Sequence, residues 1–308
     1  MANYIAIDGG TTNTRVYLVT NGRILRSEKI NIGAKKSIGG NTELKNAIGC
    51  AIAELLKAEG FKVSDIECIM ASGMITSEYG LFKLDHLVAP AGINELSRGM
   101  TRTEINDVSE LPFYFIPGVK LAGGTLEGSD MMRGEETELI GLDLQPDSIY
   151  VLPGSHSKII RTDSLGRISD FSSMLTGEMI AATVSSTILK DSVDLGAELD
   201  KEYLLKGYEY CSAHGVNESL FKVRVLCNLL KADKAQVYGF FMGVMLHDEV
   251  EQILSYSERN VVIGGRKQLR EATATLVNAF SDKNAVMLTD EAVEYSTVKG
   301  MIAVYENK

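Results

Sequence analysis

Asp8, Gly9, Gly10, Thr11 and Thr12 form a run in which a carboxylate is followed by two glycines and two hydroxyl side chains. Glycine adopts backbone angles that bulkier residues avoid, so amide N–H groups and threonine hydroxyls can converge on an anion at such a turn. A carboxylate beside a phosphate needs a cation between them, and Mg²⁺ accepts oxygen ligands of both kinds. The run therefore predicts a site for the phosphates of a metal-bound nucleotide, with an ordinary tight turn as the alternative.

The residues around this run predict the element that presents it. Apolar residues from Tyr4 to Ile7 precede the turn, and an alternating apolar pattern resumes at Val16 and Leu18. A polar tip between two such runs is typical of a β-hairpin. We therefore expect Asp8 at the tip of two antiparallel strands.

The same arrangement returns in residues 149–160, where an apolar run leads through Gly154 into hydroxyl residues and a second apolar run. Leu152 stands at the position of Asp8, so the second copy predicts phosphate binding without a metal. A duplicated phosphate hairpin indicates two similar domains that face each other over a nucleotide. The expected equivalent pairs are Gly154 with Gly10, Ser155 with Thr11, Ser157 with Asn13, and Ile160 with Val16.

An acidic segment lies between the two hairpins. Ser129 or Asp130 is expected to cap a helix that contains Glu135, Glu136 and Gly134. A glycine in the first turns of a helix costs about 1 kcal/mol relative to alanine, and a close backbone approach to a ligand would explain it. The alternative for the glutamates is that they are favourable charges at the start of a helix.

Strand and helix patterns alternate along the rest of the chain. The strand 67–71 leads into a loop at residues 72–77, which is expected to touch a substrate because ligands of open α/β sheets bind beyond the carboxyl ends of strands. The alternative for this loop is the ordinary start of a helix. Gly264 and Gly265 follow a strand at 260–263 and predict a turn packed against a purine or ribose. Other predicted strands are 113–116 and 285–288. A helix is predicted from a cap at Asn41 or Thr42 to Gly60, and further helices at 94–99, at 179–189, over most of 191–256 and, at the end, from Thr289 or Asp290.

Composition limits the classes of function. The 308 residues, 45% hydrophobic and 23% charged, are ordinary for a soluble globular protein and sufficient for two domains. A formal net charge of −10 argues against nucleic acid or an anionic membrane as the main partner. The first strand follows Met1 almost at once and no apolar run approaches roughly 20 residues, so we expect a cytoplasmic protein. The four cysteines lack CxxC spacing, which favours reduced thiols, and Cys211 with His214 would be only half of a metal site.

Together these segments resemble the 2-dehydro-3-deoxygalactonokinase family of the sugar-kinase, actin and Hsp70 ATPase superfamily. The two hairpins and the Gly264–Gly265 turn stand in the superfamily's order. The family commonly has an aromatic residue where this chain has Gly9 and a Trp where it has Ile159, which leaves the preferred sugar acid open. The segments that carry the resemblance are residues 7–13, 132–137, 153–158 and 176–178, with Gly73–Met74 and Ile116–Pro117–Gly118.

The resemblance implies ATP- and Mg²⁺-dependent phosphorylation of the terminal (6-)hydroxyl of 2-dehydro-3-deoxy-D-galactonate. It implies a carboxylate base before the second phosphate strand, which is Glu135 with Glu136 as the substitute, and it implies Asp8 as the metal ligand, through water. The implied nucleotide-binding residues are Gly10, Thr11, Thr12, Asn13, Gly154, Ser155, His156, Lys158, Gly264 and Gly265. The implied substrate-binding residues are Gly73, Met74, Arg133 and Glu178.

We therefore expect an α/β protein of two ribonuclease-H-like (actin-like ATPase) domains with a nucleotide cleft between them. Residues 1–140 would hold the first hairpin and the sugar-acid site, residues 141–289 the second hairpin and the adenosine site, and the closing helix 290–306 would pack on the first domain. ATP and a sugar acid would be the partners, and the sequence leaves open whether the chain forms a homodimer. The alternatives are a related kinase that acts on another sugar or sugar acid, and an ATPase switch that drives a partner protein.

Overall fold

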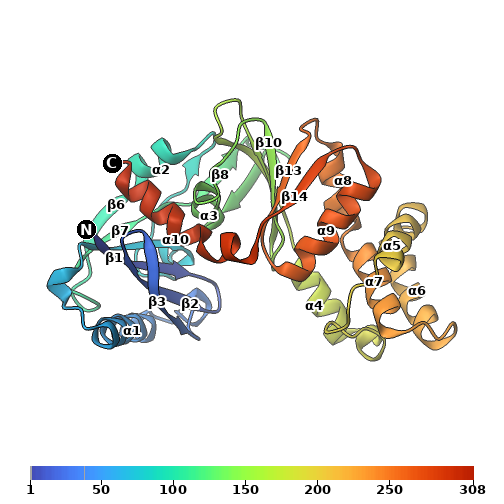
Figure 1. Cartoon of the computed structure of the whole chain (residues 1–308), viewed down its shortest axis with the longest axis horizontal. Helices are drawn as coiled ribbons and strands as arrows, with labels where there is room; N and C mark the ends of the chain where they lie inside the picture. Colours follow the sequence, from blue (N-terminus) through green and yellow to red (C-terminus); the bar gives the residue numbers. More distant parts are fainter. Residues whose placement is uncertain (1, 38) are drawn as a thin grey trace. The chain divides into compact units, whose positions relative to one another are not determined.

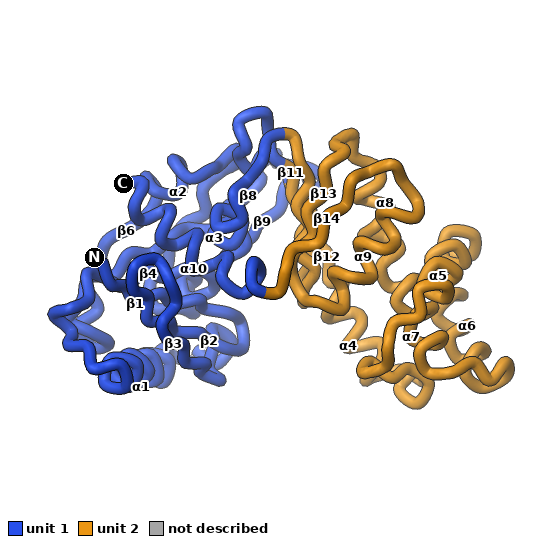
Figure 2. The backbone as a smooth tube through the Cα atoms, viewed as in Figure 1, with its two compact units in different colours: residues 1–146, 162–170, 291–308 blue, residues 147–161, 171–290 orange. Residues whose placement is uncertain are grey.

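The computed structural model describes residues 2–37 and 39–308, which divide into two compact units (Figure 2). The sequence predicts residues 162–170 in the second domain, whereas the structure assigns them to the first unit. The reason is local: Ile168 forms a backbone bridge with Ala91, and the Thr162 hydroxyl donates to the carbonyl of Gln145. Unit 1 comprises the residues up to 146 with residues 162–170 and 291–308, and unit 2 comprises residues 147–161 and 171–290.

A mixed β-sheet forms the centre of unit 1. Its strands are β1 (Asn3–Gly9), β2 (Thr14–Thr20), β3 (Arg23–Ile30), β4 (Cys68–Gly73), β6 (Thr101–Glu104) and β7 (Pro112–Phe115), in the order β3-β2-β1-β4-β7-β6. β1 and β2 form the predicted antiparallel hairpin, and β4 runs parallel to both β1 and β7. The carboxyl ends of β1 and β4 therefore meet at one edge of the sheet, where the tip with Asp8 begins.

Helices and short 3₁₀ turns pack around this sheet (Figure 1). They are α1 (Thr42–Glu59), α2 (Ile93–Gly99), α3 (Glu135–Ile140), α10 (Asp290–Glu306), η1 (Ala34–Ser37), η2 (Val63–Asp65) and η3 (Met74–Thr76). α1 buries the predicted face with Leu44, Ile48 and Leu55, and it ends at Gly60 in the left-handed conformation. Its apolar side chains join those of the sheet in one hydrophobic core.

A second, smaller sheet of unit 1 corrects one expectation. It contains β5 (Leu87–Val88), β8 (Val119–Ala122) and β9 (Ser129–Met132) in the order β5-β8-β9. The prediction that Ser129 or Asp130 caps a helix was wrong, because residues 129–132 pair antiparallel with β8. The helix α3 begins only at Glu135, with Gly134 as its N-cap.

Most of a second large sheet belongs to unit 2, and its strands are β10 (Ser148–Leu152), β11 (Ser157–Thr162), β12 (Ile168–Met174), β13 (Asn260–Ile263) and β14 (Asn284–Met287). The strand order is β12-β11-β10-β13-β14, with β10 antiparallel to β11 and β13 parallel to both β10 and β14. Apart from the added edge strand β6, this is the strand order of the sheet in unit 1. The predicted duplication therefore extends beyond the hairpins to the whole sheet.

The helices of unit 2 are α4 (Thr176–Ser186), η4 (Ile188–Asp191), α5 (Lys201–His214), α6 (Val216–Asn228), α7 (Lys234–Met245), α8 (His247–Ser255) and α9 (Lys267–Phe280). They confirm the predicted helical character of residues 191–256, and α5, α6 and α7 gather in one group (Figure 1). Their apolar faces and the sheet share a second hydrophobic core. Within the described ranges, no helix is both long and apolar enough to cross a membrane.

The two hairpins differ by one residue, which corrects the predicted equivalences. Cross-strand pairs join Asp8 to Arg15 and Leu152 to Lys158, so six residues (9–14) separate the first pair and five (153–157) the second. Lys158 is therefore the equivalent of Arg15. By the same register Ile159 and not Ile160 corresponds to Val16, and Ser157 corresponds to Thr14 and not to Asn13.

Candidate active site

The tip of the first hairpin is fixed by its backbone. The N–H of Gly10 donates to the carbonyl of Asn13 at 2.8 Å. The carbonyls of Gly10 and Thr11 accept hydrogen bonds from the N–H groups of Ala34 (3.2 Å) and Lys35 (2.9 Å) at the start of η1. Both tip threonines are exposed. A fixed backbone with outward hydroxyls is suited to holding an anion.

Asp8 lies directly behind this tip. Its carboxylate is 28% exposed and lies 3.8 Å from the guanidinium of Arg15. Burial raises the pKa of Asp8, Arg15 opposes the increase, and Glu135 adds to it. Asp8 and Glu135 are therefore close enough to interact, although they are 127 positions apart in the sequence.

Three glycines allow the backbone before α3 to lie close to the ends of β1 and β4, and so bring Glu135 near Asp8. Gly9 ends β1, Gly73 ends β4 with φ 87°, and Gly134 precedes α3 with φ 111°. A Cβ at Gly73 would lie 2.5 Å from the carbonyl oxygen of Gly9, and a Cβ at Gly134 would lie 3.2 Å from Cα of Gly73. The backbone that Gly134 approaches is thus that of Gly73, and the positive φ supplies a further reason for glycine there.

The two adjacent glutamates of α3 have different surroundings. Glu135 is partly exposed and accepts a hydrogen bond from the N–H of Arg133 at 3.0 Å. Glu136 is fully buried, and its two carboxylate oxygens accept from the N–H of Gly134 at 2.9 and 2.8 Å. Burial, with a contribution from Glu135, raises the pKa of Glu136 to about 8. The hydroxyl of Thr137 also donates to Glu136, at 3.1 Å.

Glu138 belongs to the same acidic group, although the sequence does not single it out as a site residue. Burial raises its pKa to about 8, Glu135 and Asp8 add to the increase, and a hydrogen bond with Ser296 of α10 opposes it. The spacing of Glu135 and Glu138 is a signal for this arrangement, because residues i and i+3 share a face of a helix.

Arg133, predicted to bind substrate, supports the neighbouring loop. Its guanidinium donates to the carbonyls of Thr76 (2.8 Å) and Leu84 (3.0 Å) and contacts Nδ1 of His86 at 3.2 Å. These contacts join the segment before α3 to the end of η3 and the loop that follows it. Met74 is the first residue of η3. Direct contact of Arg133 or Met74 with a substrate stays a prediction.

The tip of the second hairpin repeats the backbone contacts of the first. The carbonyls of Gly154 and Ser155 accept from the N–H groups of Gly177 (3.1 Å) and Glu178 (3.2 Å) at the start of α4. His156 is exposed, and its Nε2 lies 3.1 Å from the carboxylate of Glu178. Glu178, predicted to bind the sugar acid, therefore lies beside the second hairpin in unit 2.

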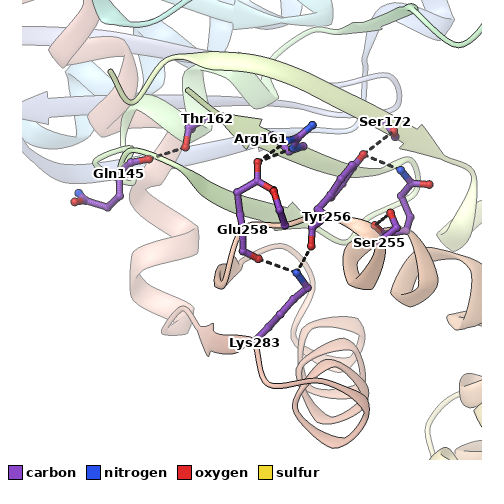
Figure 3. Close-up of polar contacts among 10 residues, drawn as sticks. Gln145, Arg161, Thr162, Ser172, Ser255, Tyr256, Glu258 and Lys283 are labelled. Carbon is purple, nitrogen blue, oxygen red and sulfur yellow. Dashed lines mark hydrogen bonds and ion pairs between the residues drawn. The ribbon is translucent and has the colours of Figure 1, made fainter. Parts of the chain in front are cut away.

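Polar contacts join the second hairpin to its neighbouring strand and loops. Lys158 is buried and donates to the hydroxyl of Ser173 on β12, so its side chain is not exposed at the tip. Arg161 at the other end of β11 donates to Glu258 at 2.7 Å and lies over the ring of Tyr256 (Figure 3). Lys283 joins this group through the carbonyl of Glu258, at 2.8 Å.

The predicted glycine turn of unit 2 also lies at this hairpin. The N–H of Gly264 donates to the carbonyl of Val151 at 2.8 Å, and Gly265 has φ 67°. Arg266, the next residue, donates from Nη2 to the hydroxyl of Ser155 at 3.0 Å. The sequence does not single out Arg266, although a cation that directly follows paired glycines was an available signal.

Cys211 and His214, the C-x-x-H pair, do not come together with a third ligand in the part of the chain that the structure describes. Among the residues that the structure describes, no three His, Cys, Asp or Glu side chains are grouped for an ion. Cys211 is buried in the core, whereas His214 stacks on Tyr210 and lies 3.8 Å from Glu218.

The predicted residues thus gather in two places, one in each unit. The places differ in their side chains, since the first contains the acidic group and the second contains Arg266 at Ser155 and the pair of His156 with Glu178. The residues in unit 1 are Asp8, Gly10, Thr11, Thr12, Asn13, Gly73, Met74, Arg133, Glu135 and Glu136, and those in unit 2 are Gly154, Ser155, His156, Lys158, Glu178, Gly264 and Gly265.

Comparison with known proteins gives consistent results. A family model described as 2-keto-3-deoxy-galactonokinase matches residues 8–303. The chain is 28% identical over 257 residues to 2-dehydro-3-deoxygalactonokinase of Escherichia coli K12, covering 83% of this chain and 82% of that protein. A crystal structure of a candidate 2-dehydro-3-deoxygalactonokinase from Sinorhizobium meliloti superposes with a TM-score of 0.79 at 21% identity, over 98% of this chain and 97% of that one.

A more distant structural neighbour shares the fold. Component A of (R)-2-hydroxyglutaryl-CoA dehydratase from Acidaminococcus fermentans gives a TM-score of 0.51 at 13% identity, over 100% of this chain and 99% of that one. At this identity the likeness concerns the fold alone, and it agrees with the expected pair of actin-like ATPase domains.

Proposed function

This chain belongs to the 2-keto-3-deoxy-galactonokinase family, and from that membership we propose that it transfers the terminal phosphate of ATP to the 6-hydroxyl of 2-dehydro-3-deoxy-D-galactonate. The products would be 2-dehydro-3-deoxy-6-phosphogalactonate and ADP. The structural observation that carries the proposal is the duplicated glycine hairpin, of which only the copy next to Glu135 bears an acid. The name shared by the relatives does not favour an ATPase switch or a kinase for another sugar.

We assign the general base to Glu135. Of the two adjacent glutamates it is the partly exposed one, and it can accept the proton of the attacking hydroxyl while that oxygen bonds to phosphorus. Glu136 is disfavoured because it is fully buried and bound by Gly134 and Thr137. With a pKa near 8 it would also carry a proton at neutral pH. We infer that Glu136 fixes the N-terminal end of α3 and so the position of its neighbour.

Mg²⁺ fits the first hairpin by the chemistry of its donors. Asp8 offers carboxylate oxygens beside other acids, and Mg²⁺ is usually bound by one or two carboxylates together with substrate phosphates and water. When bound, the ion would neutralise phosphate charge.

We expect Asp8→Asn to weaken activation by Mg²⁺, so a titration of activity against Mg²⁺ should give a clearly higher half-saturating concentration. A wild-type titration curve would contradict the assignment.

The exposed backbone and hydroxyls of the two tips would bind phosphate oxygens. Thr11 and Thr12 serve this role in unit 1, and Ser155 serves it in unit 2. Because phosphoryl transfer depends mainly on positioning and charge neutralisation, rigid tips of this kind are suited to it.

A coupled ATP-consumption assay tests the proposal. Purified protein with ATP and Mg²⁺ is supplied with 2-keto-3-deoxy sugar acids, the galactonate and gluconate isomers side by side. We expect ADP release with 2-dehydro-3-deoxy-D-galactonate and a product phosphorylated at the terminal carbon. Absence of ADP release with every sugar acid would refute the proposed activity.

A further inference from the structure

Arg266 is held at the second hairpin by its own backbone. Gly265 has φ 67°, and a Cβ there would overlap the carbonyl oxygen of Pro153. The N–H of Arg266 donates to that same carbonyl at 3.0 Å. The turn after β13 is therefore tied to the end of β10, immediately before the tip that contains Ser155.

The side chain of Arg266 points back to this tip. Its Nη2 donates to the hydroxyl of Ser155 at 3.0 Å, and the residue is exposed. In the described part of the chain, no carboxylate forms an ion pair with Arg266. The neighbouring cations Lys267 and Arg270 both pair with Asp290, the former at 3.5 Å. Arg266 thus brings a positive charge to the tip without an ion pair of its own among the described residues, whereas the nearby carboxylate of Glu178 contacts His156.

A comparison of the equivalent glycine turns after β4 and β13 shows that only the turn in unit 2 is followed by a positively charged residue. Gly73 ends β4 opposite Gly9 as Gly265 lies opposite Pro153, and both glycines have positive φ and no room for a Cβ. The residue after Gly73 is Met74, an uncharged side chain. The same turn therefore carries methionine beside the acidic hairpin and arginine beside the hairpin that has Leu152 in place of an acid.

We infer that the guanidinium of Arg266 contacts a phosphate oxygen of the nucleotide at Ser155. This rests on the proposed function only for the identity of the ligand as a nucleoside di- or triphosphate. Arginine is well suited to phosphate because its planar N–H groups bind two oxygens at once. Arg266 is then a nucleotide-binding residue that acts on phosphate and not on the nucleoside.

Calorimetric titration with ATP, ADP and adenosine tests this on the full-length protein. Arg266→Met should weaken ATP and ADP binding roughly 10- to 100-fold, as expected for one charge-assisted hydrogen bond, and leave adenosine binding unchanged. Arg266→Lys keeps the charge and should lose less. Lys267→Met is the matched control, since it removes the adjacent cation, and it should bind all three ligands as wild type does.

The outcomes separate this inference from the proposed function. Wild-type ATP affinity in Arg266→Met, or an equal loss for adenosine and ATP, would overturn the role on phosphate. If the wild-type protein binds ATP through Arg266 but phosphorylates no sugar acid, the inference stands and the proposed substrate fails. If the wild-type protein is an active kinase with an unaffected Arg266→Met variant, only the inference fails. A wild-type protein that binds none of the three ligands would overturn both.

Discussion

Glu135 and Glu136 are adjacent in the chain, yet the first turn of α3 gives them opposite surroundings. One carboxylate is partly exposed beside Asp8, and the other is enclosed by the N–H of Gly134 and the hydroxyls of Ser72 and Thr137. The residue type is the same, so burial and hydrogen bonding alone decide which acid can meet a substrate.

Glu135→Gln separates the roles of the two acids. Glutamine keeps an oxygen that can accept the N–H of Arg133 but cannot take up a proton, so we expect turnover to fall at least about a hundredfold. The Michaelis constant for ATP should change little. Glu127→Gln, on an exposed loop residue, is the matched control and should turn over normally. Near-normal turnover of Glu135→Gln would remove it from the role of base.

Glu136 predicts a dependence of stability on pH. Its pKa is about 8 in the folded protein against an ordinary value of 4.5, so the folded state retains a proton that the unfolded chain has released. The contribution of Glu136 to stability is thus fully present below the unfolded pKa and is lost as pH rises through about 8. We expect Glu136→Gln to flatten this fall in denaturant titrations at several pH values, with a remaining slope from Glu138. Parallel wild-type and variant curves would contradict the assignment.

The sequence predicts which acidic residues belong to the candidate site better than it predicts which of them is buried and which is exposed. Asp8 and the Glu135–Glu136 pair stand out by type and by their neighbours. Which glutamate is buried depends on Ser72 of a distant strand, and Arg266 gains its meaning from Ser155, a residue 111 positions away. Contacts of this kind cannot be read from local patterns.

α3 is a short helix whose two ends are fixed by glycine contacts. At its start Gly134 lies against Gly73, and at its end Gly141 lies against α10. The contact with α10 is reciprocal, because a Cβ at Gly141 would overlap the carbonyl of Ser296 and a Cβ at Gly300 would overlap that of Thr137. The closing helix therefore sets where α3 lies, and with it Glu135.

Gly300→Ala tests this support. Alanine favours helix by about 1 kcal/mol, but its methyl group would have to displace the backbone of α3, an overpacking that typically costs about 1–3 kcal/mol. We expect a lower melting temperature and reduced turnover. Lys299→Ala, at the exposed neighbouring position, should match wild type in both measurements. A Gly300→Ala variant with unchanged melting temperature and turnover would show that α3 is positioned by other contacts.

Elements set by local signals are predictable, and their registers are less so. Alternating apolar residues around a glycine turn are sufficient for both hairpins, and Gly60 for the end of α1. The one-residue difference in length between the two hairpin tips is not predicted, because it depends on how the residues of the two strands pair. Strand β9 escapes because its partner is β8, and the short sequence Ser129–Met132 has no strong preference of its own.

At the scale of the whole molecule, each unit has its own hydrophobic core. The core of unit 1 includes Ile69 and Phe113, and the core of unit 2 includes Ile253 and Val261. Separate cores favour separate cooperative unfolding, because each unit loses its own buried apolar surface.

A pair of conservative variants tests this separation. Ile69→Val and Ile253→Val each remove one methylene from one core, which typically costs about 0.5–1.5 kcal/mol. We expect two transitions in differential scanning calorimetry, with each variant lowering only one of them. A single two-state transition that both variants shift equally would contradict the prediction.

The position of α10 also affects the order in which the protein can assemble during synthesis. The ribosome makes β1, β4 and α3 early, then all of unit 2, and only afterwards the helix that carries Ser296 and Gly300. A nascent chain therefore holds α3 without its packing partner while the whole second unit emerges. Since domains fold as units once their parts are available, the corner that brings Glu135 to Asp8 is expected to be completed late. A ribosome-bound chain stalled before α10 would then have a folded second unit while Glu135, the proposed general base, is not yet in place.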